Sequence, residues 1–130
     1  RAVQAEFSCG FCTDAQGAQT IGRTFRESRY LLDTHTAVAC TVLDAYRAET
    51  GDQTLTVVES TASPFKFCAS VLDALGVTEH APGTGVLGQL TAETGRPAPG
   101  PLASLAGKAV RFDQVTDRGD MRAVVTEFLR

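Results

Sequence analysis

Three hydroxyl side chains, Ser60, Thr61 and Ser63, stand between a short apolar run and a helix-like pattern. The run at 54–59 is rich in β-branched residues, which is typical of a short buried strand. Pro64 suits the first position of the next helix, and Ser63 suits its N-cap. Ligands of open parallel sheets bind beyond the carboxyl ends of strands, so these hydroxyls are candidates for ligand contacts. They also suit a purely local role, in which they cap the helix and satisfy the turn.

A second polar group lies where another helix is expected to begin. Asp33 or Thr34 suits the N-cap of a helix over about 35–50, and Gly51 follows its end. His35 then lies in the first turn, where the helix dipole disfavours a protonated ring, so we expect a neutral side chain. A histidine in this position can also simply pack and hydrogen-bond locally.

Two short motifs match catalytic or cofactor-binding signatures but lack the context that those signatures need. Ser63 and Lys66 form an SxxK motif, yet the SDN and KTG motifs of acyl-serine enzymes are absent from the sequence. The stretch 83–88 matches GxGxxG, but no strand is expected before it, and Lys108 stands about where that fingerprint needs an acid. We interpret the first motif as a helix cap and the second as a loop that leads into a helix.

The four cysteines do not predict a metal or redox centre. Cys9 and Cys12 form a CxxC motif that lacks the second CxxC or histidine pair of a zinc site. Cys40 and Cys68 lie in apolar helical patterns, and we expect them to be thiols of the core. Reduced cysteines fit a cytoplasmic location, and no metal ligand is predicted.

Length and charge limit the classes of protein and partner. The 130 residues fit a single domain over 1–130, and the net charge of −3 without a basic patch argues against nucleic acid as the main partner. The same charge argues against an anionic membrane surface, and no apolar run is long enough to span a bilayer.

The apolar spacing predicts an α/β fold, mostly helical and packed around a short sheet. Its central strand is expected at about 54–59 and an edge strand at about 108–113. One strand cannot pair with itself, so its partners would be missing sequence, the 108–113 segment or a second copy. An exposed strand edge would favour a homodimer. The first 17 residues are expected to be irregular, and helices are predicted at about 20–30, 35–50, 64–75 and 85–94, and from Met121.

Two stretches resemble segments of threonine synthases. LLDTHTAVA at 31–39 resembles the family segment written as a hydrophobic pair followed by DPHTAV, and STASPFKF at 60–67 resembles STAHPAKF. The stretch 7–25 resembles, more weakly, the segment just upstream. The chain departs from the family pattern at three positions, where Pro, His and Ala are usual: Thr34, Ser63 and Phe65.

This resemblance implies the C-terminal part of a fold-type-II enzyme that uses pyridoxal phosphate (PLP), the tryptophan-synthase-β type. Threonine synthase converts O-phosphohomoserine and water to threonine and phosphate. The family's Schiff-base lysine lies upstream, and neither Lys66 nor Lys108 matches it. The resemblance therefore implies an isolated chain that is inactive and binds no PLP alone, with the missing N-terminal portion and a small-molecule substrate as its partners. Because the only methionine is Met121, the sequence does not begin at an initiator.

The resemblance also implies the residues of the cofactor cleft. In this fold type a Ser or Thr hydroxyl binds the ring nitrogen of PLP, and Thr61 is the candidate here, with Ser60 beside it. His35 and Thr36 match the DPHTA segment and are expected to line the same cleft. The alternative is a stand-alone, non-catalytic binding or scaffold module of the same fold, which the three departures favour.

Overall fold

The computed structural model describes residue 3 and residues 6–130, and its regular elements are helices. In chain order they are α1 (Asp14–Ser28), α2 (Thr34–Thr50), η2 (Pro64–Lys66), α3 (Cys68–Ala74), α4 (Gly85–Thr94), α5 (Gly100–Ala103), η3 (Ser104–Gly107) and α6 (Met121–Phe128).

Helix α1 begins earlier than its sequence pattern predicts. Its N-cap is Thr13, which forms a capping box with Gln16. The backbone N–H of Gln16 donates to Thr13 Oγ1 at 3.3 Å, and the Thr13 N–H donates to Gln16 Oε1 at 2.8 Å. The prediction that the helix begins near Thr20 was therefore wrong. Thr20 is buried within α1 instead, with its hydroxyl oxygen 2.8 Å from that of Thr41 on α2.

Most of the other predicted helix boundaries near the candidate site are confirmed, but the single helix predicted at 64–75 is divided into η2 and α3, with Phe67 in neither element. Asp33 caps α2, which ends at Gly51 in the left-handed conformation, with φ +73°. Ser63 caps η2, because its hydroxyl oxygen accepts a hydrogen bond from the Phe65 N–H at 3.3 Å. The stretch 83–88 forms a turn and the start of α4, as its interpretation as a loop and helix start predicted.

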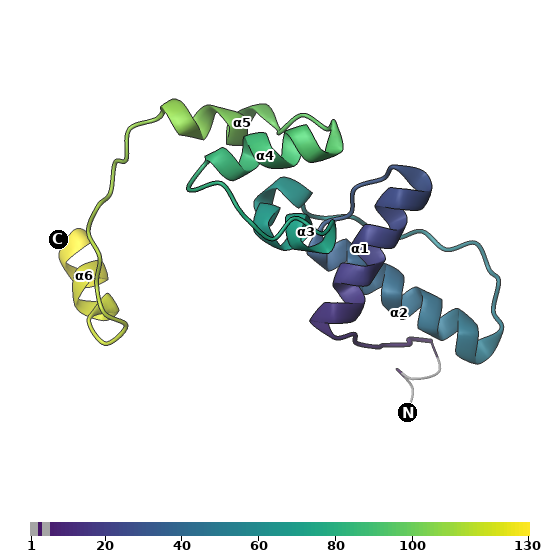
Figure 1. Ribbon diagram of the computed structural model, residues 1–130. Coiled ribbons are helices and arrows are strands. Elements are labelled where there is room, and N and C mark those ends of the chain that lie inside the picture. The colour runs from purple at the N-terminus through teal and green to yellow at the C-terminus, as the bar shows by residue number, and fades with distance from the viewer. Residues whose placement is uncertain (1–2, 4–5) are drawn as a thin grey trace.

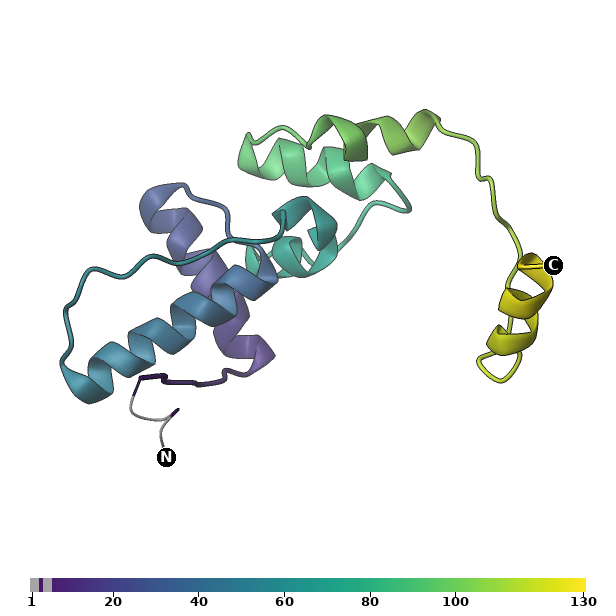
Figure 2. The same ribbon diagram turned by 180° about the vertical axis from the view of Figure 1, so that it is seen from behind.

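The core forms where α1, α2 and α3 pack against one another, and α4 extends it by packing on α3 (Figures 1 and 2). Helix α5 lies beside α4, and Leu102 packs against the edge of the same core. The core consists of Ile21, Leu32, Ala37, Phe65, Cys68, Val71, Leu72, Leu87 and Leu90. Burial of these side chains supplies the main stabilisation of the fold, and it fixes the first turns of α2 and α3 relative to α1.

The predicted sheet is absent from the described residues, so the α/β fold class was wrong and the structure is helical. The segment 54–59 is irregular and follows α2, with the side chains of Leu55 and Val57 93% and 85% exposed. The predicted edge strand at 108–113 is irregular as well, and Phe112 is 78% exposed. A strand is stabilised by hydrogen bonds to a neighbouring strand, and no segment of the described chain supplies one to either stretch. Apolar periodicity alone does not reveal whether such a partner exists.

Helix α6 forms where the strongest helical pattern predicted it, but it lies apart from the other helices. An irregular segment after η3 leads to it (Figures 1 and 2). Its apolar side chains, among them Val125 and Phe128, are exposed. None of the helices in the described part of the chain has the length and hydrophobicity that a membrane crossing requires.

Candidate functional site

The carboxylate of Asp33 is the centre of a hydrogen-bond cluster in which Asp33 and Thr36 are buried and Ser60 is exposed. Asp33 is only 1% exposed. Its Oδ1 accepts the backbone N–H groups of His35 at 2.9 Å and Thr36 at 3.3 Å. Its Oδ2 accepts the Thr36 hydroxyl and, at 3.4 Å, the Ser60 hydroxyl. The hydroxyl oxygens of Thr36 and Ser60 are themselves 2.9 Å apart. We call Asp33, Thr36 and Ser60 the Asp33 cluster.

The cluster keeps a buried negative charge. Burial by itself raises the pKa of the Asp33 carboxyl, because a low-dielectric environment disfavours the ionised form. The hydrogen bonds from the Thr36 hydroxyl and from the two backbone N–H groups outweigh burial, so the pKa lies below its ordinary value. Asp33 is therefore ionised at neutral pH and draws hydroxyl donors toward it.

Ser60 and Thr61 are neighbours in sequence but differ in their surroundings. The Ser60 hydroxyl contacts Asp33 and Thr36, so its hydrogen-bonding capacity is largely used within the protein. Both residues are exposed, but the Thr61 hydroxyl makes no hydrogen bond to another described residue. Of the two hydroxyls predicted to contact a cofactor, the one of Thr61 is therefore open to a ligand.

The ring of His35 lies at the surface beside the cluster. It packs against the ring of Phe67, with centroids 5.0 Å apart. Its Nδ1 is 3.4 Å from Thr34 Oγ1 and also 3.4 Å from Asp33 Oδ1. The side chain is 67% exposed, so one face of the ring remains accessible.

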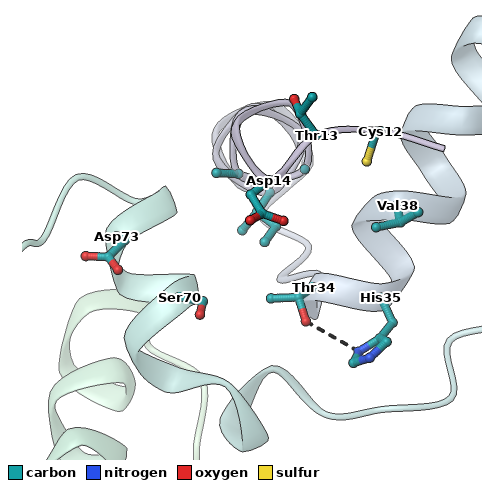
Figure 3. Close-up of a pocket in the computed structure, with 11 residues that line it drawn as sticks. Cys12, Thr13, Asp14, Thr34, His35, Val38, Ser70 and Asp73 are labelled. Carbon is teal, nitrogen blue, oxygen red and sulfur yellow. Dashed lines mark hydrogen bonds between the residues drawn. The ribbon is translucent and has the colours of Figure 1, made fainter.

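A cleft of about 540 Å³ lies between the N-terminal ends of α1 and α2 and one side of α3. Figure 3 shows Asp14 on α1, His35 on α2, and Ser70 and Asp73 on α3 around it. The ring of His35 is part of its lining. The side chains of the other predicted site residues, Thr36, Ser60 and Thr61, are not among those that line it.

Several polar groups near the cleft were not predicted as site residues. Asp33 was predicted only as a helix cap, since nothing in the sequence shows that a residue 27 positions later reaches it. Asp73 on α3 lies beside His80 of the following loop, with Asp73 Oδ1 3.1 Å from His80 Nε2. No group of three or more His, Cys, Asp or Glu side chains among the described residues is arranged to hold a metal ion.

The cysteines are all free thiols. Cys68 is buried, with its Sγ 3.2 Å from the carbonyl oxygen of Phe65, and burial raises the pKa of its thiol. Cys40 is half-buried, and burial raises the pKa of its thiol as well. Cys68 is therefore the core thiol that was predicted, whereas Cys9 is exposed and Cys12 lines the cleft.

Comparison with known proteins gives a consistent result. Residues 36–126 match a family model described as "Threonine synthase, C-terminal". The chain is similar to "Threonine synthase-like 1" of Mus musculus, at 36% identity over 78 residues that cover 59% of this chain and 10% of that protein. It is also similar to the human protein of the same name, at 32% identity over 77 residues with the same coverage. The matched region spans about a tenth of the length of these relatives.

Proposed function

The chain belongs to the threonine synthase family, and from that premise we propose that it is the C-terminal part of a PLP-dependent lyase. The proposed reaction converts O-phosphohomoserine and water to threonine and phosphate. In this proposal the polypeptide upstream supplies the lysine that holds the cofactor, and this chain supplies residues of the cofactor cleft. We also propose a cytoplasmic location for the intact enzyme.

The observation that carries the proposal is the contact between the two family-like segments. Thr36 from 31–39 and Ser60 from 60–67 lie with their hydroxyl oxygens 2.9 Å apart, although their sequence positions differ by 24. This contact places the exposed Thr61 next to a fixed point of the fold. The two segments that resemble the family therefore form one structural unit.

The free hydroxyl of Thr61 fits the cofactor's ring nitrogen. Bound PLP would supply an electron sink for carbanion chemistry at the substrate. A neutral hydroxyl leaves the ring nitrogen largely unprotonated, which moderates that sink. Both Ser60 and Thr61 are exposed, but the Ser60 hydroxyl is held by Asp33 and Thr36, whereas that of Thr61 is free to bind a ligand.

The positions of the two lysines support the proposal that the isolated chain does not hold the cofactor and is inactive. Lys66 is exposed on η2, with its Nζ 5.9 Å from the centre of the Phe67 ring. Lys108 is exposed after η3. Neither lines the cleft between α1, α2 and α3. We expect borohydride reduction of the 130-residue chain with PLP to give no stoichiometric adduct, and a stoichiometric adduct at Lys66 would contradict the proposal.

The role of Thr61 is tested in the intact enzyme. Thr61→Val should lower the rate of phosphate release from O-phosphohomoserine while the cofactor stays bound, because only the contact to the ring nitrogen is lost. Thr61→Ser keeps a hydroxyl and should restore the rate, and Thr78→Val, at another exposed threonine, is the matched control. An unchanged rate in Thr61→Val would remove Thr61 from the cofactor site.

A second candidate function is a stand-alone binding or scaffold module. The observation in its favour is that the cleft of about 540 Å³ is formed entirely by this chain, and Thr34, one of the departures from the family, lines it. The complete reading frame distinguishes the two candidates. An upstream segment with the cofactor lysine supports the enzyme, whereas a frame that starts near Arg1 supports the module.

The homodimer stays a prediction. The strand edge from which it was inferred is not formed in the described residues, but Leu55 and Val57 still expose apolar side chains. Light scattering during size-exclusion chromatography would measure the mass of the particle directly.

A further inference from the structure

We propose that Asp33 is a positioning residue whose carboxylate holds Ser60 against the first turn of α2 and so fixes Thr61 for the cofactor. The inference rests on the proposed function, because Thr61 matters only if it faces the ring nitrogen. It adds a residue that acts through Ser60 and contacts no ligand itself.

The second carboxylate oxygen of Asp33 has a role that helix capping does not explain. An N-cap needs one side-chain oxygen, and Asp33 Oδ1 accepts both backbone N–H groups at the start of α2. A serine, threonine or asparagine would cap a helix about as well. Oδ2 is bound instead by the hydroxyls of Thr36 and Ser60. The buried charge therefore serves the contact to the 60–67 segment.

Ser60 is the last anchor of a long irregular segment between α2 and η2. Near its start, Arg47 Nη2 donates to the carbonyl oxygen of Thr54 at 3.2 Å and to the hydroxyl of Thr56 at 3.3 Å. Near its end, the side-chain contacts to α2 are those of Ser60 with the Asp33 cluster. Without them, the residues before Ser63 would lose their attachment to the helix.

The same contacts select Thr61 over Ser60. Both residues are exposed, but the Ser60 hydroxyl donates to the buried carboxylate of Asp33, whereas the Thr61 hydroxyl has no hydrogen-bond partner in the described chain. Asp33 thus occupies the Ser60 hydroxyl, so that it does not compete for the ligand, and fixes the backbone that carries the Thr61 hydroxyl. A ring nitrogen at this position would then meet a single hydroxyl partner.

Nuclear magnetic resonance on the 130-residue chain tests the tether without any cofactor. Asp33→Ser keeps the cap but lacks the second oxygen, and Ser60→Ala leaves the cap untouched. In both variants the backbone order parameter at Thr61 should fall from about 0.85 to below about 0.6, while the amides of α2 keep their values. Ser60→Thr retains the hydroxyl and should keep the parent value. Unchanged order at Thr61 in Asp33→Ser and Ser60→Ala would overturn the proposal.

The absorption spectrum of bound PLP in the intact enzyme tests the second step. Asp33→Ser should shift the spectrum in the same direction as Thr61→Val, and Ser60→Thr should leave it unchanged. If Thr61→Val shifts the spectrum and Asp33→Ser does not, the positioning role is wrong although the cofactor contact stands. If order at Thr61 falls in Asp33→Ser but Thr61→Val leaves the spectrum unchanged, the tether exists, but the proposed cofactor contact fails and the positioning role fails with it.

Discussion

Helices α1 and α3 meet at Gly22, and this contact gives a sharp test of the fold that frames the cleft. A Cβ atom on Gly22 would lie 2.6 Å from the carbonyl oxygen of Ala74, in the last turn of α3. That distance is too short for a real contact, and a backbone oxygen cannot move alone. Gly22→Ala must therefore push α3 away from α1. These two helices carry Asp73 and Asp14, which line opposite sides of the cleft.

The expected magnitude is the difference between two effects. Alanine in place of glycine inside a helix gains about 1 kcal/mol, whereas overpacking costs about 1–3 kcal/mol. Since the clash is with backbone, the upper part of that range applies, and Gly22→Ala should lose about 1–2 kcal/mol of unfolding free energy. Gly17→Ala in the same helix is the matched control, because the nearest atom to its Cβ, Cys12 Sγ, is 4.0 Å away. It should gain about 1 kcal/mol.

Urea unfolding followed by circular dichroism at 222 nm measures both variants. Their unfolding free energies should differ by about 2–3 kcal/mol, which exceeds the error of linear extrapolation for a small domain whose unfolding free energy is about 5–15 kcal/mol. If Gly22→Ala is stabilised as much as Gly17→Ala, the close approach of α1 and α3 is refuted, and with it the shape of the cleft.

Three further predictions follow from burial and charge. Because the pKa of Asp33 is lowered in the fold, its contribution to stability is present above the unfolded pKa of about 3.9 and is lost as pH falls through the lower folded pKa. Unfolding free energies measured from pH 6 to pH 2 should therefore depend less on pH in Asp33→Asn than in the parent. Equal pH dependence in the two proteins would contradict the Asp33 cluster. Removal of residues 108–130, none of which is buried, should change the unfolding free energy of the remaining helices by less than about 0.5 kcal/mol, and a larger loss would show that α6 packs on them. A thiol reagent at neutral pH should modify the exposed Cys9 quickly and Cys68 only on unfolding, since burial both shields the Cys68 thiol and raises its pKa. Mass spectrometry of the labelled peptides measures the two rates, and equal rates would contradict the burial of Cys68.

Local chemistry explains which parts of the fold were predictable. The caps at Asp33 and Ser63 and the end of α2 at Gly51 depend on residues a few positions apart, so the sequence displays them directly. The start of α1 was misplaced because Thr20 is also a capping residue type, and only packing against Thr41 reveals its role within the helix. The sheet failed for a different reason: the apolar run at 54–59 has the composition of a strand but no partner in the described chain.

In the candidate site, too, some features are local in sequence and others depend on tertiary contacts. The residue types at Thr61, Ser60, His35 and Thr36, and the family to which the chain belongs, were readable from two contiguous segments. The sequence by itself could determine these because capping and motif identity are local properties. Only the tertiary structure decided that the Ser60 hydroxyl is held by Asp33 while that of Thr61 has no partner in the described chain, and that Asp14 and Asp73 border one cleft with His35. Those relations join residues far apart in the chain, and they exist only because burial of the shared core packs α1, α2 and α3 together.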